Sequence, residues 1–420
     1  MACFENRFLI KGRPKAELLT VGTELVRGSV VNTNAAYLGQ ELTKLGFDVH
    51  AQSACVDDAV EIKNSLRVAL NRSDIILVSG GLGPTPDDIT RDAIADYFHT
   101  SLVFSQKQFN LIRRYYQKKN KTVPDIVRRE ARLPAIAKPV LNQFGIALGF
   151  LIEKKGCILI ALPGVPAELV RLFEHHVKPY FQKKFSGLKP ASVLITKTVG
   201  LSEPAIMQKL GPSFFKIGGG AFQFGIYPET GQVELRIYSD SKQTSRHLKQ
   251  HIERKLGPHI YSFSDESLET VIARSFSKRR WTISVAESCT GGRIAGALTK
   301  TPGASAYFSG GVVAYGDQIK KQVLLIPSQI IKRYGAVSKQ TAAAMAHQTR
   351  IQFKTKLGLG ITGVAGPSGG SPRKPVGLVY IAISSANDSK VWEEHFVGDR
   401  CQIQERASKK ALEYLWRWIF

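Results

Sequence analysis

Short apolar runs that end in glycine alternate with segments of helical periodicity along most of this chain of 420 residues. Residues 16–22 and 74–80 are two such runs, and Leu38, Leu42 and Leu45 recur at helical spacing between them. The second run is continuously apolar at its centre, which is typical of a strand buried on both faces of a parallel sheet. Strands that alternate with helices form right-handed βαβ units. We therefore expect an α/β fold whose ligands bind at the carboxyl ends of the strands.

The length and the spacing of chain breakers predict three parts. Residues 14–185 form the first α/β segment, and a Gly and Pro pair at 187–190 ends it. Residues 188–263 follow the order strand, helix, hairpin, helix, with the hairpin turn at 228–231, and predict a small split α+β module. Residues 264–420 again alternate apolar runs and helical segments, and predict a second layered α/β domain.

The net charge of +24 is the one unusual global property of the chain. It favours nucleic acid, anionic membrane surfaces or phosphorylated small molecules as partners. The densest basic stretch, residues 113–129, contains Tyr115 and Tyr116, and basic residues with aromatics can bind nucleic acid. A solvated helix face in a lysine-rich protein explains the same residues, and we favour it. Nucleic acid is therefore not the partner that we expect.

Hydropathy and cysteine usage exclude several classes of protein. The sequence has no apolar run of the roughly eighteen residues that a membrane helix needs, so we expect no membrane partner. The start of the chain has one short apolar patch, residues 8–10, and no cleavage-like site, which argues against a signal peptide. The five cysteines are far apart and form no CxxC pair. This pattern argues against a zinc site or a disulfide framework and fits a reducing cytoplasm.

A glycine-rich loop follows the buried strand of the first domain. It runs from Gly80 to Thr90 and opens a helix, so its backbone can approach a ligand closely and its helix start favours an anion. Asp87 and Asp88 in this loop are available for a metal or a ribose hydroxyl. Capping of the helix is the alternative role for either aspartate.

The C-terminal domain collects polar side chains and glycine turns within about a hundred residues. Serine, threonine, tyrosine and lysine in such a setting suit acyl chemistry on a phosphate-bearing substrate. A Ser–Lys pair can make a serine nucleophilic without histidine, and glycine-rich turns can hold an anion. The four segments concerned are residues 285–292, 302–305, 314–320 and 361–370.

The first domain resembles the N-terminal domain of the CinA (competence/damage-inducible protein) family, which is similar to molybdopterin-binding proteins. The motifs that carry the resemblance are GTEL at 22–25, NTN at 32–34, GGLGPTPDD at 80–88 and LPGVP at 162–166. The resemblance implies binding of a nucleotide or pterin phosphate, and in some members a metal-dependent ADP-ribose pyrophosphatase activity. The residues that it implies for the nucleotide site are Glu24, Asn34, Asp57, Gly81, Asp87 and Asp88, the last two also for a divalent metal.

Two departures from the family pattern weaken the pyrophosphatase prediction. Asn32 stands where members usually have aspartate, so a carboxylate that could serve a metal is absent. Ile146 and Leu148 stand where members usually have threonine and proline, which removes a hydroxyl and a rigid turn from a predicted phosphate loop. Loss of activity in this domain is a hypothesis that follows.

The C-terminal segments resemble the CinA C-terminal domain over its whole length. The resemblance implies a nicotinamide mononucleotide amidohydrolase of NAD salvage, which forms nicotinic acid mononucleotide and ammonia and needs no cofactor. On this basis Ser305 is the candidate nucleophile, Lys320 the base, and Tyr315 the group that relays or orients the proton. Lys320 would need a lowered pKa, which burial or a nearby cation can supply. The residues implied for substrate contacts are Ser288, Thr362, Gly366, Gly369 and Arg400.

Several alternatives stay open in this domain. Ser288 could instead cap the helix that follows it, and Tyr315 could simply pack at a strand end. Cys289 is a rival nucleophile, although a cysteine beside an apolar helix start is more often buried and inert. Gln404 stands where members often have a second arginine, so the affinity for a phosphate-bearing substrate could be lower.

The middle segment corresponds in the CinA family to a KH-like module. KH domains bind single-stranded nucleic acid through a GxxG loop between two helices, and the glycines at 218–220 lie between predicted strands instead. We therefore favour a spacer or dimerisation module, in a protein that we expect to be a homo-oligomer, most simply a dimer. The rival to the enzyme is a non-catalytic nucleotide- or nucleic-acid-binding protein, which the positive charge supports.

Overall fold

The computed structural model describes residues 13–154, 156–188, 192–220 and 222–420. The short apolar patch at residues 8–10 lies outside the described residues. The chain divides into two compact units, one that ends at residue 191 and one over 192–420, which we describe separately. The predicted C-terminal domain and, from residue 192 on, the predicted middle module fall within the second unit. Among the described residues, no helix is long and apolar enough to cross a membrane.

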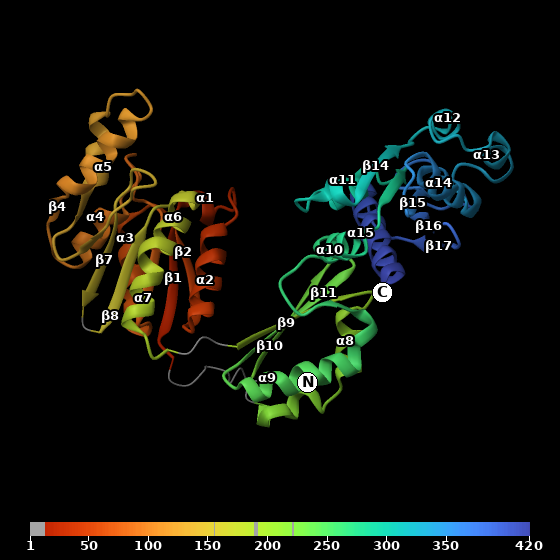
Figure 1. Cartoon of the computed structure of the whole chain (residues 1–420). Helices are drawn as coiled ribbons and strands as arrows, with labels where there is room; N and C mark the ends of the chain where they lie inside the picture. The colour runs from red at the N-terminus through yellow and green to blue at the C-terminus, as the bar shows by residue number, and fades with distance from the viewer. Residues whose placement is uncertain (1–12, 155, 189–191, 221) are drawn as a thin grey trace. The chain divides into compact units, whose positions relative to one another are not determined.

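The first unit is built on a six-stranded sheet of order β2-β1-β3-β8-β7-β6 (Figure 1). The first four of these strands are parallel, and the last two run antiparallel to their neighbours. The strands are β1 (Lys15–Val21), β2 (Asp48–Cys55), β3 (Ile75–Ser79), β6 (Lys138–Val140), β7 (Gly149–Lys154) and β8 (Cys157–Leu162).

Helices cover both faces of this sheet. Leu18 and Leu77 pack into one apolar cluster, whereas their neighbours Leu19 and Val78 pack into the other, because successive side chains of a strand point to opposite faces. This explains why β3 is apolar at every position. One face carries α2 (Thr33–Leu45), α6 (Pro166–Leu172) and α7 (Lys178–Lys184), and the other carries α3 (Ala59–Arg72) and α4 (Thr90–Tyr97).

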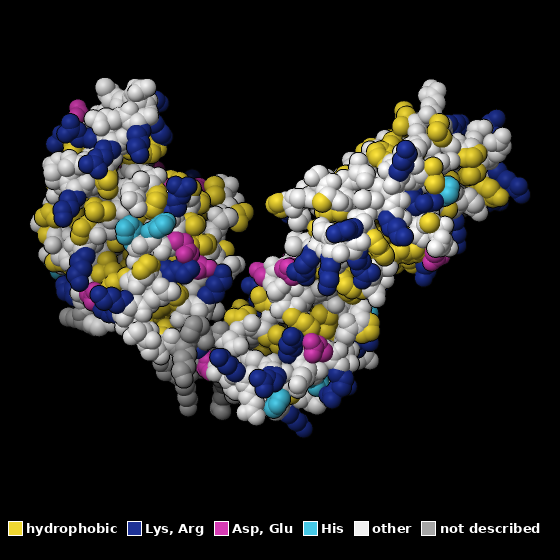
Figure 2. All heavy atoms as spheres, viewed as in Figure 1, with side chains coloured by type: hydrophobic (Ala, Val, Ile, Leu, Met, Phe, Trp, Pro, Cys, Tyr) yellow, Lys and Arg dark blue, Asp and Glu magenta, His cyan; other side chains and the backbone are white. Residues whose placement is uncertain are grey.

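A smaller extension of the first unit contains the basic stretch. A two-stranded pairing of β4 (Leu102–Phe104) with β5 (Arg132–Pro134) forms its base. Helix α5 (Gln106–Gln117) carries the first part of the stretch, and a 3-10 turn at Asp125–Ala131 carries the last part. Figure 2 shows Lys and Arg side chains spread over much of the visible surface of both units, without a single dense patch.

The second unit begins with the small α+β module. Its four-stranded antiparallel sheet has the order β10-β11-β9-β12. The predicted order of elements and the hairpin are confirmed, and β12 is an addition that the sequence pattern did not show. The elements are β9 (Ser192–Val199), α8 (Glu203–Leu210), β10 (Gln223–Glu229), β11 (Gln232–Ser239), α9 (Lys242–Leu256) and β12 (Ile260–Ser262).

The rest of the second unit is a five-stranded sheet of order β14-β13-β15-β16-β17. The first three strands are parallel, so their carboxyl ends lie at the same edge of the sheet, and β16 and β17 run antiparallel. The strands are β13 (Ile283–Glu287), β14 (Phe308–Val313), β15 (Leu357–Gly363), β16 (Leu378–Ser384) and β17 (Ser389–His395).

Helices again cover both faces of this sheet. The large core cluster joins α10 (Leu268–Arg279), α11 (Arg293–Thr299) and α15 (Arg400–Ile419) to one face. Helix α14 (Lys339–Gln352) packs on the other face, where Ala342 and Ala346 contact Ala382. Ser338 caps α14, since its side chain accepts from the Thr341 N–H. Two short helices, α12 (Asp317–Gln322) and α13 (Ser328–Tyr334), follow β14.

Candidate functional site

The turn after β13 is shaped by the buried carboxylate of Glu287. Its Oε2 accepts from the Thr290 hydroxyl at 2.6 Å and from the backbone N–H groups of Gly292 and Ile294 at 3.0 and 3.2 Å. Its Oε1 accepts from the Ala295 N–H at 2.8 Å. One carboxylate thus satisfies the donors at the start of α11, which a helix start otherwise leaves without partners. As a result, Ser288 is fixed at the carboxyl end of β13.

Ser288 contacts the predicted base. The Lys320 ammonium donates to the Ser288 hydroxyl at 3.1 Å and to the Tyr315 carbonyl at 3.2 Å. Lys320 is only 1% exposed, and burial lowers its pKa because the low-dielectric interior disfavours the charged form. The Asp317 carboxylate, 3.9 Å from the ammonium, opposes this shift. The pKa of Lys320 is therefore shifted in the direction that a general base requires.

Arg400, the first residue of α15, links two of the other candidate residues. Its guanidinium donates to the Gly366 carbonyl at 2.7 Å and also to the Tyr315 hydroxyl. The capping box of Asp399 and Gln402 fixes the start of α15 and hence the position of this arginine. The structure thus gathers Ser288, Lys320, Tyr315, Gly366 and Arg400 at the carboxyl-end edge of the sheet, around a permanent positive charge.

The remaining candidates of this domain have structural partners. The Thr362 hydroxyl donates to the Ala336 carbonyl at 2.8 Å, and Gly369 lies in the exposed turn beyond Gly366. Gln404 donates to the Cys289 carbonyl at 2.8 Å, so its amide braces the turn that holds Ser288. Burial raises the pKa of the Cys289 thiol to about 12, which makes this cysteine a poor nucleophile.

Ser305 lies away from this group within its own chain. It sits in an exposed 3-10 turn at Ala304–Ala306, just before β14 begins, whereas Tyr315 and Lys320 come after β14 has ended. The six residues of β14 alone separate the two ends by roughly 17 Å, at about 3.3 Å per residue. Hence one copy of the chain brings Ser288, and not Ser305, to Lys320. Sequence order alone could not show this, because the segments at 302–305 and 314–320 lie close together in the sequence.

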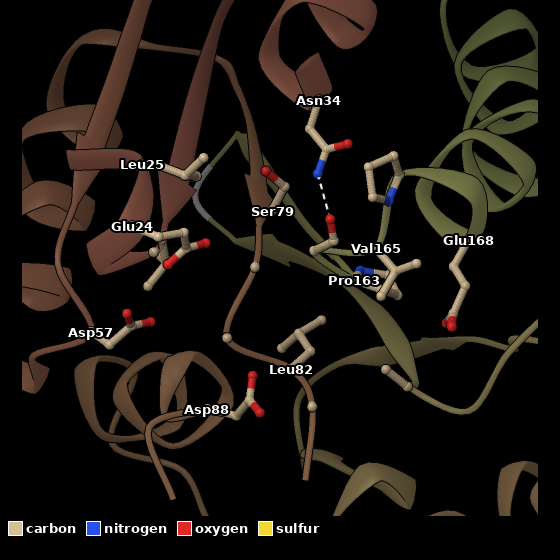
Figure 3. Close-up of a pocket in the computed structure, with 18 of the residues that line it drawn as sticks. Glu24, Leu25, Asn34, Asp57, Ser79, Leu82, Asp88, Pro163, Val165 and Glu168 are labelled. Carbon is tan, nitrogen blue, oxygen red and sulfur yellow. Dashed lines mark hydrogen bonds between the residues drawn. The ribbon is translucent and has the colours of Figure 1, made fainter. Parts of the chain in front are cut away.

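The first unit contains a second candidate site. A cavity of about 450 Å³ lies at the carboxyl ends of the parallel strands, and Figure 3 shows Glu24 and Asp57 on one side of it and Glu168 on the opposite side. Each residue implied for the nucleotide site lines this cavity. They are Glu24, Asn34, Asp57, Gly81, Asp87 and Asp88.

Hydrogen bonds already occupy several of these side chains. Asp57 accepts from the N–H and the hydroxyl of Thr23 at 2.7 and 2.8 Å, which fixes the Gly22 turn. Asp88 accepts from the Thr85 N–H at 2.9 Å and from its hydroxyl, within its own loop. Asn34 donates to the Gly164 carbonyl at 2.7 Å, as the dashed line in Figure 3 marks. Among the described residues, no group of three or more His, Cys, Asp or Glu side chains is close enough to hold a metal ion as it stands.

Two acidic residues that line this cavity were not predicted from the sequence. Glu130 is fully buried, neither of its carboxyl oxygens has a hydrogen-bond partner in the protein, and burial raises its pKa to about 8. Burial also raises the pKa of Glu168, which accepts from the Asn142 amide at 2.6 Å. Their sequence positions gave no signal, because Glu130 directly follows the basic stretch and Glu168 follows Pro166 in an ordinary helix start.

Comparisons with known proteins match both parts of the chain. Residues 265–419 match the family described as CinA C-terminal domain, and residues 17–183 match the one described as probable molybdopterin binding domain. A competence-damage inducible protein from Caldicellulosiruptor bescii is 39% identical over 95% of this chain and 98% of its own length. The chain belongs to the CinA family. A CinA-like protein from Dictyoglomus thermophilum is 36% identical, with 96% of this chain and 98% of that protein covered.

Solved structures of CinA proteins align with parts of the chain. The structure of CinA from Thermoplasma acidophilum is 34% identical and covers 40% of this chain and 98% of its own, with a TM-score of 0.37. A competence/damage-inducible protein from Agrobacterium tumefaciens is 39% identical and covers 35% of this chain and 91% of its own, with a TM-score of 0.35. The family itself is confirmed over nearly the whole chain by the two family matches and the two sequence relatives.

Proposed function

We propose that the C-terminal domain hydrolyses the amide of nicotinamide mononucleotide to nicotinic acid mononucleotide and ammonia. The observation that carries this proposal is the buried Lys320 in hydrogen-bond contact with a serine hydroxyl, beside Arg400. Amide hydrolysis by an acyl-enzyme route needs a nucleophile and a base that can take and return a proton. A lysine with a lowered pKa meets the second need, because more of it is in the neutral form that accepts a proton.

The surroundings of Lys320 suit an anionic nucleotide. Arg400 holds the Gly366 turn and Tyr315, and its charge can attract a phosphate. Tyr315 is 58% exposed, so its ring and hydroxyl are accessible to a substrate. The Tyr315 hydroxyl accepts from Arg400 and its carbonyl accepts from Lys320, so Tyr315 can orient both side chains. No group beyond these side chains is needed for proton transfer.

Ammonia release from nicotinamide mononucleotide tests the proposal. We expect Lys320→Met to lower kcat by at least about a thousandfold, because the base is lost while the apolar stem is kept. Lys321→Met is the matched control, since the neighbouring lysine on the same helix is only partly buried, and we expect it to keep wild-type turnover. Turnover in Lys320→Met within tenfold of the wild type would refute the role of this lysine.

We also propose that the first unit binds a nucleoside diphosphate in this cavity and hydrolyses ADP-ribose there with a divalent metal. The clustering of six family-implied residues around one cavity at the carboxyl ends of the strands supports this. Hydrolysis of ADP-ribose with Mg²⁺ or Mn²⁺ is the test, with Glu24→Gln as the variant. Binding without turnover in the wild type would leave only the nucleotide-binding half of this proposal.

A further inference from the structure

The cavity of the first unit is acidic, although the chain as a whole carries a net charge of +24. Six carboxyl side chains line it, whereas none of the described residues in its lining is lysine, arginine or histidine. The six are Glu24, Asp57, Asp87, Asp88, Glu130 and Glu168. A divalent metal can neutralise part of this charge, but a bound phosphate also needs hydrogen-bond donors from the protein. In this cavity such donors must come from backbone N–H groups or from neutral side chains.

Glu130 differs from the acids that hold the loops of this cavity. Asp57, Asp88 and Glu168 each accept hydrogen bonds from donors of the protein. Glu130 is completely buried, and neither of its carboxyl oxygens has a hydrogen-bond partner. A buried polar group without a partner costs free energy, and a ligand that fills the cavity can supply the partner. Because no hydrogen bond holds this carboxyl, it can turn toward a ligand without breaking one.

Backbone contacts place Glu130 between the two loops that we expect to hold phosphate. Its carbonyl accepts from the Leu148 N–H at 3.1 Å, which joins it to the loop at 145–149. The preceding residue, Arg129, donates to the Asp88 carbonyl at 3.2 Å, which joins the same turn to the glycine-rich loop. The loop at 145–149 presents only apolar side chains to the cavity, those of Ile146 and Ala147. A carboxyl at this place can supply the side-chain donor that the loop lacks.

Burial is the largest influence on the protonation of Glu130, and it raises the pKa of the carboxyl to about 8. Asp88 and Glu168 act in the same direction, whereas Arg91 and Arg129 oppose it. The carboxyl is therefore mostly neutral at neutral pH and carries a proton that it can donate. An ionised carboxylate could only accept hydrogen bonds and would repel a phosphate.

We propose that the neutral carboxyl of Glu130 donates a hydrogen bond to a phosphate oxygen of a nucleoside diphosphate bound in this cavity. A hydrogen bond from an O–H group to an ionised oxygen is short and strong, and exclusion of water strengthens it further. Glu130 thereby favours a diphosphate over the nucleoside without phosphate. The inference rests on the proposed nucleotide binding by the first unit, and it does not require that the bound ligand be hydrolysed.

Calorimetric titration of the full-length chain with the methylene analogue of ADP-ribose tests this contact. The analogue has a P–CH₂–P bridge in place of P–O–P, so its binding can be measured with Mg²⁺ present and without turnover. Glu130→Met keeps the size of the side chain but has no polar hydrogen, and should weaken binding by about ten- to a hundredfold. Glu130→Gln keeps a donor in its amide and should restore most of the affinity. Asp125→Asn, which alters an exposed carboxylate on the same 3-10 turn, is the control and should bind as the wild type does.

The pH dependence of binding distinguishes a hydrogen-bond donor from a residue that only supports the loops. Both phosphoryl groups of the analogue are esterified, so the analogue itself does not titrate near neutral pH. The wild-type affinity should be full below the pKa of Glu130, and should fall by about tenfold between pH 7 and pH 9 as the carboxyl loses its proton. Glu130→Gln should not show this fall, because its amide keeps its hydrogens. A fall caused by Glu168 would persist in Glu130→Gln.

Adenosine, which has a base and a ribose but no phosphate, identifies the part of the ligand that Glu130 contacts. It should bind the wild type and Glu130→Met equally. Equal affinity of these two proteins for the methylene analogue would overturn the inference, as would an equal loss for adenosine, since the contact would then be to the ribose or the base. If the analogue binds with the expected Glu130 effects but ADP-ribose is not hydrolysed, the pyrophosphatase proposal fails and the inference stands. A wild type that does not bind the analogue would overturn both.

Discussion

Removal of the Glu287 carboxylate should lower the free energy of unfolding of the C-terminal domain more than removal of an exposed carboxylate does. Glu287→Ala deletes four hydrogen bonds at once, three of them from backbone N–H groups at the start of α11. Each buried donor left without a partner costs about 1–3 kcal/mol, with some relief where water enters. We therefore expect the free energy of unfolding to fall by about 4 kcal/mol or more.

Glu287→Gln separates the hydrogen bonds from the charge. The amide oxygen can take the Oε2 position and keep three bonds, but the NH₂ group would then face the Ala295 N–H as a second donor. One bond is lost and one unfavourable contact is made. The expected loss is about 2 kcal/mol, between those of the wild type and Glu287→Ala.

Urea unfolding followed by tryptophan fluorescence measures this in the full-length chain. The four tryptophans all lie in the C-terminal domain, so the signal reports that domain alone; they are Trp281, Trp392, Trp416 and Trp418. Glu405→Ala, an exposed glutamate on α15, is the control and should change stability by less than about 0.5 kcal/mol. A loss below about 1 kcal/mol in Glu287→Ala, or an equal loss in both Glu287 variants, would refute the reasoning.

Three further predictions concern the two sites. The lowered pKa of Lys320 means that kcat/KM should rise with pH through that pKa as the amine loses its proton, and a profile that falls with pH over this range would contradict it. Arg400→Gln should raise KM by about ten- to a hundredfold with a smaller effect on kcat, as steady-state kinetics would show, because it removes a charge that faces the substrate. Glu130 has a raised pKa of about 8, so its contribution to stability is present below pH 4.5 and is lost as pH rises through 8, by about 1.4 kcal/mol per pH unit at most. Glu130→Gln should remove this dependence. Thermal unfolding followed by circular dichroism at pH 5 and pH 9 measures it in the transition of the first unit, which tryptophan fluorescence does not report because all four tryptophans lie in the C-terminal domain.

Much of the fold follows from local patterns in the sequence. The continuous apolar run of β3 indicates a buried strand, the leucine spacing of α2 indicates a helix, and Ser338 is a suitable cap for the start of α14. These features can be recognised in the sequence because each depends on only a few neighbouring residues. The strand β17 was missed because its residues are half-exposed and charged, as befits a protected edge. The antiparallel β6 and β7 were missed for a related reason, since their pairing depends on contacts across the sheet.

The candidate sites show the same difference between features that local sequence determines and features that depend on how the strands pair. Residues in glycine-rich motifs were found, and those of the first unit do lie around one cavity. The contact between Ser288 and Lys320 spans 32 positions and depends on how β13 and β14 pair, so no spacing rule reveals it. The position of Ser305 at the far end of β14 likewise depends on strand direction. Glu130 could not be found at all, since only burial makes its carboxyl unusual.

The central claim is that this domain cleaves an amide through a serine ester whose proton is handled by Lys320. Trapping with hydroxylamine tests it most directly, because an ester intermediate reacts with this nucleophile whether or not it accumulates. We predict that nicotinamide mononucleotide turned over in hydroxylamine yields the hydroxamate alongside nicotinic acid mononucleotide, while ammonia release continues. Ammonia release with no hydroxamate at any hydroxylamine concentration would contradict the account, because water would then attack the amide directly.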